Sequence, residues 1–108
     1  MIAILYRWRI VAGQEVAFAE AWRTITEALY AHGGSLGSSL HLAADGTYVA
    51  YARWPSLQAR TAGFAAELPG ITAARQTMKD AIAEAWPEQP LTVVCDALRI
   101  TRSPVGQV

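Results

Sequence analysis

The stretch Thr47–Trp54, with the sequence TYVAYARW, decides the fold because turn and helix signals flank it. Asp45-Gly46 before it is a hairpin signal, and Pro55-Ser56 after it ends a strand and supplies a helix N-cap. Alternation gives the strand two faces, Tyr48, Ala50, Ala52 and Trp54 on one and Thr47, Val49, Tyr51 and Arg53 on the other. Both faces carry aromatic groups, which predicts a central strand.

Hydrophobic periodicity predicts the elements around this strand. Period-two alternation predicts strands over 2–10 and 36–43, and the second is rich in Ser and Gly, which favours a sheet edge. Helical spacing predicts a helix over 14–32 that ends at Gly33-Gly34. After Trp54 we expect a short helix over 56–68, a longer helix containing Ile71, Ala74, Met78, Ile82, Ala85 and Trp86, and a last strand over 91–100.

The order strand, helix, strand, strand, helix, strand is the split βαβ plan. It predicts an α+β, ferredoxin-like domain over residues 1–101 and a tail over 102–108. The domain would have a four-stranded antiparallel sheet with helices on one face.

The other face of that sheet is predicted to be apolar. It carries Leu5, Val49 and Tyr51, joined by Leu40 and Leu42 if the hairpin loop has two or four residues. Leaving such a face in water forfeits about 25 cal/mol per Å² of burial. We therefore predict a homodimer whose sheets face each other.

Composition excludes several classes of function. Nine basic and nine acidic residues give no net charge, so neither nucleic acid nor an anionic membrane is an expected partner. His32, His41 and the single Cys95 show no metal-ligand spacing, and Cys95 is expected to pack inside a strand. The apolar start reaches Arg7 too early for a signal peptide, and no run could span a bilayer. A soluble, cytoplasmic protein is expected.

Several of these motifs together resemble the antibiotic biosynthesis monooxygenase family of dimeric α/β barrels. The features are Tyr6-Arg7-Trp8-Arg9, the Gly13 turn, the glycine-rich start of the second strand, the Asp45-Gly46-Thr47 turn and Tyr51-Ala52-Arg53-Trp54 leading into Pro55-Ser56. The resemblance covers residues 2 to about 100. It implies a cofactor-independent monooxygenase that oxidises a small electron-rich aromatic, such as a phenol or anthrone, to a quinone with molecular oxygen.

The resemblance also implies a set of site residues. Trp54 stands where quinone-forming members carry a pocket tryptophan, and Arg75 lies close to an arginine of their later helix. Ala50 replaces an asparagine of those members, and Arg60 replaces a tyrosine. We take Trp54 and Arg75 as catalytic candidates. The substrate-binding candidates are Tyr6, Ala50, Arg60 and Phe64.

His41 is a third catalytic candidate, as a base, and its position depends on the hairpin loop. A loop of two or four residues would place His41 on the face of Ala50 and Trp54. A loop of three residues would turn it to the other face, as an ordinary edge-strand histidine. Both alternatives are open at the level of sequence.

Haem-degrading members of the family pair a histidine with a tryptophan on the second helix, where this chain has Ala73 and Gly63. Without an imidazole to ligate iron, no haem is expected. Two functions remain: the monooxygenase, and a non-catalytic dimer that binds a small apolar ligand or serves in assembly. They differ in whether Trp54, Tyr6 and His41 surround an open cavity.

Overall fold

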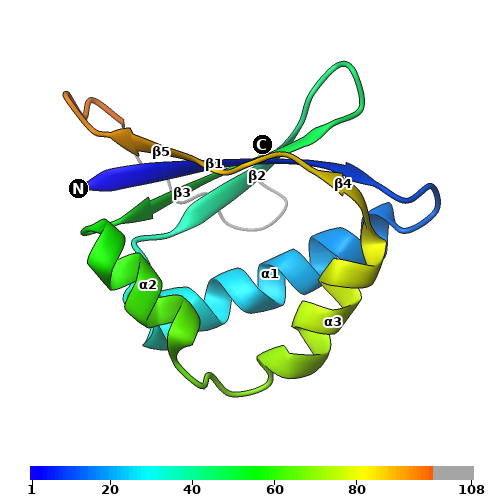
Figure 1. Ribbon diagram of the computed structural model, residues 1–108, viewed down its shortest axis with the longest axis horizontal. Helices are drawn as coiled ribbons and strands as arrows, with labels where there is room; N and C mark the ends of the chain where they lie inside the picture. Colours follow the sequence, from blue (N-terminus) through cyan, green and yellow to red (C-terminus); the bar gives the residue numbers. More distant parts are fainter. Residues whose placement is uncertain (99–108) are drawn as a thin grey trace, which may run out of the picture.

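The computed structural model describes residues 1–98, which form an α+β domain of three helices and five strands. In chain order the elements are β1 (Ile2–Ile10), α1 (Glu15–His32), β2 (Ser38–Leu42), β3 (Tyr48–Trp54), α2 (Leu57–Ala65), α3 (Ile71–Ala81), β4 (Ile82–Ala85) and β5 (Gln89–Thr92). The helices gather on one side of an antiparallel sheet (Figure 1), which confirms the ferredoxin-like fold class. The predicted tail and the end of the predicted last strand, residues 99–108, lie outside the described residues.

The strand that decides the fold is interior to the sheet, as predicted. β3 pairs with the edge strand β2 on one side and with β1 on the other. β1 is paired along its second edge with β5 over its N-terminal part and with β4 over its C-terminal part. The register of β1 and β3 sets Ile2 opposite Trp54 and Tyr6 opposite Ala50.

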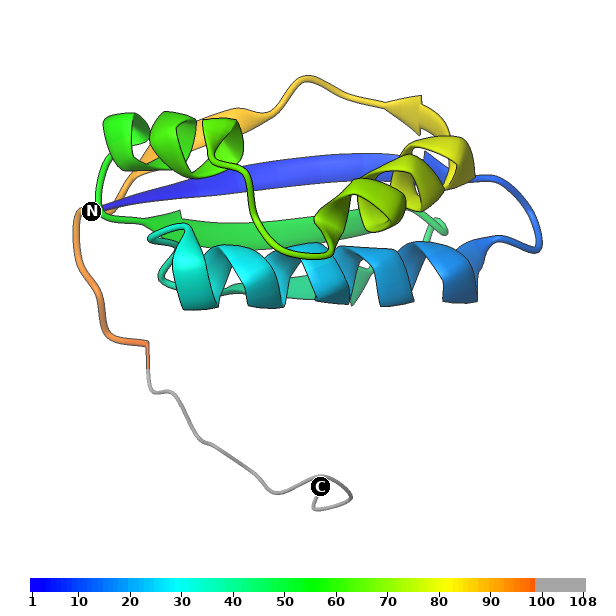
Figure 2. The same cartoon turned by 90° about the horizontal axis from the view of Figure 1, so that it is seen from below.

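The helices cover the sheet face that carries alternate residues of β1 and β3. Two clusters of buried side chains form the core there, one of Ile4, Ile25, Leu29, Ala52, Trp54 and Ile71, and one of Trp8, Ile10, Phe18, Ala50 and Ala81. α1 runs nearly parallel to the strands (Figure 2), so its apolar stripe spans both clusters. No helix within residues 1–98 has the length and apolar character needed to cross a membrane.

The predicted long second helix ends earlier than expected. α3 stops at Ala81, while Ile82 and Ala85 lie in β4 and Trp86 follows it. Periodicity alone does not distinguish a short apolar strand from a helix continuation. The strand forms because β1 offers an edge, where the N–H of Trp86 donates to the carbonyl of Arg7 at 3.1 Å.

The predicted last strand is also displaced. β5 begins at Gln89 and ends at Thr92, rather than spanning 91–100, and β4 makes a fifth strand. Pro90 lies within β5 and has no N–H to donate, which is tolerated because β5 is at the edge of the sheet. Cys95 lies beyond β5 and is exposed, so its predicted packing in a strand is wrong.

The β2–β3 hairpin has a loop of three residues, 44–46. The N–H of Ala43 donates to the carbonyl of Thr47 at 2.8 Å and closes this loop. Gly46 has a φ of 89°, the left-handed conformation that three-residue loops need. Asp45 Oδ1 accepts from the N–H and the hydroxyl of Thr47, at 3.0 and 2.7 Å, and these bonds hold the pKa of Asp45 below its ordinary value.

The loop length settles which face each β2 residue occupies. His41 lies opposite Val49 and therefore on the open face, away from the helices. Leu40 and Leu42 lie opposite Ala50 and Tyr48, on the helix-covered face, because the loop has three residues and not the two or four that would place them on the open face. Leu5, Val49 and Tyr51 lie on the open face, and each is partly buried.

Candidate functional site

A cavity of about 190 Å³ lies between the sheet and the helices. Its lining comes from all three helices and from β1, β2 and β3, and most of it is aromatic or aliphatic. The lining residues are Tyr6, Trp8, Trp22, Ile25, Thr26, Leu29, Ser35, Ser38, Ala50, Ala52, Trp54, Phe64, Arg75 and Met78. An apolar cavity with a few polar groups is the usual form of a small-molecule site.

Trp54 is the deepest polar group of this lining, with 1% of its surface exposed. Its Nε1 is buried and has no hydrogen-bond acceptor within the described residues. A Cβ built on Gly63 would lie 2.8 Å from the indole Cζ3 and Cη2, so the benzene edge of the ring packs against α2. The Nε1 edge is on the opposite side of the indole and faces away from Gly63.

The position of Trp54 follows from local sequence. It is the last residue of β3, and Pro55 and Ser56 then turn the chain into α2. The Ser56 hydroxyl accepts from the N–H of Ala59 at 3.0 Å, which confirms the predicted N-cap. This cap fixes the start of α2 and brings Gly63 and Phe64 against the indole, with the two aromatic centroids 5.8 Å apart.

Tyr6 lines the cavity from β1, and Arg60 of α2 holds its hydroxyl. Arg60 Nη2 donates to the Tyr6 oxygen at 3.2 Å and also pairs with the Glu88 carboxylate. Burial raises the pKa of Tyr6 above its ordinary value, and the bond from Arg60 opposes this only in part. Tyr6 therefore stays a neutral O–H donor, and its acceptor side is directed to Arg60.

The guanidinium of Arg60 is packed rather than solvated. Its Cζ lies 4.6 Å from the centroid of the Phe64 ring, and its Nε is buried without an acceptor in the described part of the chain. Arg60 is not among the cavity-lining residues. It touches the site through Tyr6 and Phe64, so its predicted direct role in binding substrate becomes an indirect one.

Arg75 of α3 lines the cavity at its solvent-exposed side. Its Nη2 donates to the carbonyl of Phe64 at 3.3 Å, and no carboxylate within residues 1–98 lies within ion-pair distance. Lys79, one helical turn further along α3, is exposed and lies outside the lining. Among residues 1–98, Arg75 is the one charged residue that lines the cavity.

The structure thus brings together most of the predicted site. Trp54, Arg75, Tyr6, Ala50 and Phe64 all line one cavity, and the small side chain of Ala50 opposite Tyr6 leaves part of the space open. His41 does not join them. Its Nδ1 lies 3.0 Å from the carbonyl of Val49 on the open face, so its assignment as pocket base is wrong.

Sequence reasoning missed three features of the site. Glu88, which pairs with Arg60, lies between β4, where the end of a longer helix was predicted, and β5, which begins earlier than the predicted last strand. Gly63 is buried and admits the indole because it has no side chain. The hydroxyl residues Thr26, Ser35 and Ser38 line the cavity beside α1 and β2, and the Ser- and Gly-rich composition of 33–39 was a weak signal for them.

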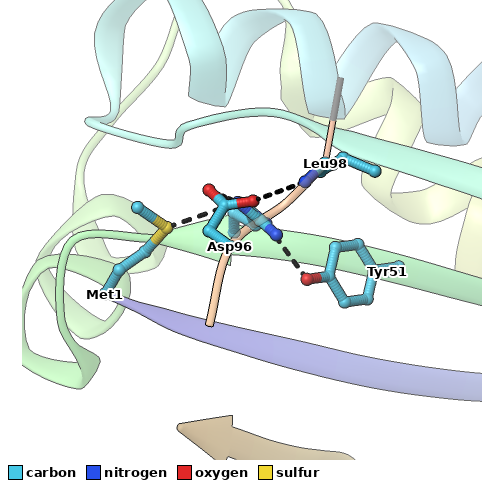
Figure 3. A network of polar contacts seen from close by, with 5 residues as sticks. Met1, Tyr51, Asp96 and Leu98 are labelled. Carbon is cyan, nitrogen blue, oxygen red and sulfur yellow. Dashed lines mark hydrogen bonds and ion pairs between the residues drawn. The ribbon is translucent and has the colours of Figure 1, made fainter. Parts of the chain in front are cut away.

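The charged groups of the open face pair with one another. Arg53 Nη1 lies 2.6 Å from Asp96 Oδ2, and its Nε donates to the Tyr51 hydroxyl at 3.0 Å (Figure 3). Arg9 pairs with Glu84 at 3.4 Å, and Arg7 stacks on Trp86. The hydrogen bond from Arg53 holds the pKa of the Asp96 carboxyl below its ordinary value.

No model of a known protein family matches the sequence, and no curated protein matches it. Solved structures do. Rv0793 from Mycobacterium tuberculosis is 17% identical with a TM-score of 0.72, and the match covers 90% of this chain and 98% of that one. SnoaB, a cofactor-independent oxygenase from Streptomyces nogalater, is 14% identical with a TM-score of 0.72 over 91% of this chain and 97% of its own.

A provisionally assigned antibiotic biosynthesis monooxygenase from Chloroflexus aurantiacus J-10-fl is similar to the same degree. It is 14% identical with a TM-score of 0.73, and the match covers 88% of this chain and 94% of that chain. Sequence identities at this level support a shared fold. The chemistry has to be argued from the residues of the site. The chain therefore has the fold of the antibiotic biosynthesis monooxygenases, the family that its sequence motifs resemble.

Proposed function

We propose that the protein is a cofactor-independent monooxygenase that oxidises a small electron-rich aromatic with molecular oxygen. The observation that carries the proposal is the Nε1 of Trp54, a buried donor without an acceptor beside an apolar cavity. Leaving such a donor unsatisfied costs about 1–3 kcal/mol. A ligand oxygen is the natural acceptor, since a flat aromatic fits the lining and carries an oxygen at its edge.

The proposed chemistry needs the phenol as its anion. The anion passes one electron to O₂, the two radicals join to form a C–O bond, and the resulting hydroperoxide loses water to give a quinone. One oxygen atom of O₂ enters the product and the other leaves as water. Trp54 N–H and Tyr6 O–H are the donors that stabilise negative charge on the substrate oxygen inside a low-dielectric cavity.

The proton leaves without a side-chain base at the cavity. Within residues 1–98, no aspartate, glutamate or histidine lines the cavity, and Tyr6 is protonated at neutral pH. The donors lower the pKa of a bound phenol, and water at the open side accepts its proton. This predicts a rate that follows the ionisation of the substrate rather than that of a histidine.

The lack of a lining base also favours the second candidate function. In that alternative the protein binds a small apolar ligand without converting it. The proposed homodimer is common to both functions. It would cover Leu5, Val49 and Tyr51 on the open face, and neither alternative changes that surface.

Oxygen uptake with 1-naphthol separates the two functions. The monooxygenase should consume one O₂ per 1,4-naphthoquinone formed and incorporate one oxygen-18 atom from labelled O₂. Trp54→Phe should lower kcat by about 10²-fold, the usual effect of removing one donor to an oxyanion. Trp86→Phe is the matched control, because Trp86 lies outside the cavity.

Equal kcat in the Trp54→Phe variant and the unmodified protein would remove Trp54 from the mechanism. Binding of 1-naphthol without oxygen uptake would favour the non-catalytic alternative. Circular dichroism of each variant verifies that the fold is intact.

A further inference from the structure

We propose that the ligand of the cavity is an aromatic of one or two rings that carries a carboxylate, held by Arg75 at the cavity rim. The inference rests on the proposed function for the oxidised hydroxyl only, and it names the substrate class of that site. Three observations carry it: the charge of the lining, the free donors of Arg75 and the volume of the cavity.

The charge of the lining is positive. In the described part of the chain, Arg75 is the one charged residue among the cavity-lining side chains, and no carboxylate accompanies it there. Within residues 1–98, the ion pairs engage Arg9, Arg23, Arg53 and Arg60. Arg75 thus places a guanidinium beside an apolar cavity in a chain with no net charge. An anionic ligand is attracted electrostatically to this guanidinium, and a neutral ligand is not.

The donors of Arg75 are mostly unused. The guanidinium has five N–H groups, and one Nη2 contact to the Phe64 carbonyl is its single hydrogen bond within residues 1–98. That contact ties the guanidinium to α2 beside Phe64, whose ring packs on Trp54. The remaining N–H groups match the two oxygens of a carboxylate, which arginine binds in a bidentate manner.

Burial orients the ligand. The side chain of Trp54 is 1% exposed, whereas Arg75 is exposed to solvent. The cavity lining therefore changes from apolar at its base to charged at its rim. A ligand with its ring inside, its hydroxyl at Trp54 or Tyr6 and its carboxylate at the rim would satisfy both ends. The carboxylate stays partly hydrated there and avoids the cost of full burial.

Volume limits the ring system. A closed apolar cavity of about 150 Å³ binds benzene. The 190 Å³ found here has room for a substituted single ring or two fused rings. Three fused rings, as in an anthrone, would extend past the rim of the cavity.

The test compares an acid with its neutral isostere. Equilibrium dialysis of the full chain would give Kd for 3-hydroxybenzoate and for 3-hydroxybenzamide, which have the same shape and differ in charge. We expect the acid to bind about tenfold more tightly. Arg75→Gln should abolish that preference, and Arg75→Lys should restore part of it.

Lys79→Gln is the matched control, since it removes the same charge from the same helix outside the cavity. It should keep the tenfold preference. Binding of 9-anthracenecarboxylate at least tenfold weaker than 3-hydroxybenzoate would support the size limit. The proposal is overturned if the amide binds as tightly as the acid, if Lys79→Gln loses the preference as Arg75→Gln does, or if the three-ring acid binds as well.

The outcome is separable from that of the monooxygenase proposal. An intact preference for the acid without oxygen uptake on any phenol would overturn the oxidation and support the ligand class. Oxygen uptake with equal kcat/KM for acid and amide would support the oxidation and overturn the ligand class. Failure of the protein to bind either probe would also overturn the ligand class.

Discussion

The two faces of the sheet differ in how their polar groups are satisfied. On the helix-covered face, Trp54 Nε1 and Arg60 Nε are buried without acceptors among residues 1–98, beside or close to an apolar cavity. On the open face, Arg53 has Asp96 and Tyr51, and Arg9 has Glu84. The comparison teaches that charged groups of the open face are paired within the protein, whereas two buried donors of the helix-covered face have no acceptor among residues 1–98 and lie where the proposed ligand would bind.

The largest expected effect is on the open face. Val49→Lys would place an ammonium in the proposed dimer interface, with Arg7 and His41 as its cross-strand neighbours. An unpaired buried charge costs about 3–5 kcal/mol. We expect loss of the dimer, measured by light scattering, with the unmodified protein at twice the 11.7 kDa chain mass or a multiple of that dimer.

Val16→Lys makes the same substitution on α1, where Val16 is 72% exposed, and should leave the dimer intact. A well-folded monomer of the unmodified protein would contradict the dimer. The open face would then be exposed to solvent. Only the cavity would distinguish the helix-covered face from it.

The next effect concerns the packing behind Trp54. In Gly63→Ala the new Cβ would meet the Gly33 carbonyl oxygen at 2.6 Å and the indole at 2.8 Å, so backbone or ring must shift. Overpacking costs about 1–3 kcal/mol, more than the roughly 1 kcal/mol of helix propensity that alanine gains. Denaturant unfolding should show a net loss of up to about 2 kcal/mol together with a changed Trp54 fluorescence.

Gln58→Ala, an exposed change on the same helix, should alter the free energy of unfolding by less than about 0.5 kcal/mol. If Gly63→Ala were as mild, Trp54 would be free to move. The cavity wall would then be adaptable rather than fixed.

A smaller effect tests the donor role of Tyr6. Because burial raises the pKa of Tyr6, its O–H persists on the alkaline side of its ordinary value, and the rate–pH profile should show no fall near pH 10. Tyr6→Phe should lower kcat about tenfold at every pH, which corresponds to about 1.4 kcal/mol, without changing the profile's shape. A variant profile with a new inflection would instead identify Tyr6 as a titrating base.

The smallest expected effect is that of His41. His41→Ala removes a side chain on the open face, so kcat should stay within about twofold of the unmodified protein's value. A tenfold loss of kcat in a folded dimer would mean that His41 acts in the site, which would erase the functional difference between the faces.

Much of this protein is determined by short-range sequence patterns. Alternation identifies β1 and β3 and assigns Trp54 and Val49 to opposite faces, because successive side chains of a strand point to opposite sides. Apolar spacing identifies α1, and Ser56 marks the start of α2 because a hydroxyl at that position satisfies a free N–H. The resemblance of these motifs to a known family selected Trp54 and Arg75 as candidates, and both line the cavity.

Tertiary structure decided the features for which these local patterns allow more than one conformation or placement. The segment Ile82–Ala85 suits helix or strand, and it becomes β4 because the edge of β1 supplies hydrogen-bond partners. One residue of loop length turned His41 from the cavity to the open face, since a strand reverses its faces at every residue. Glu88 and Gly63 acquire their roles only through contacts with Arg60 and Trp54, distant in sequence, and no local pattern encodes such contacts.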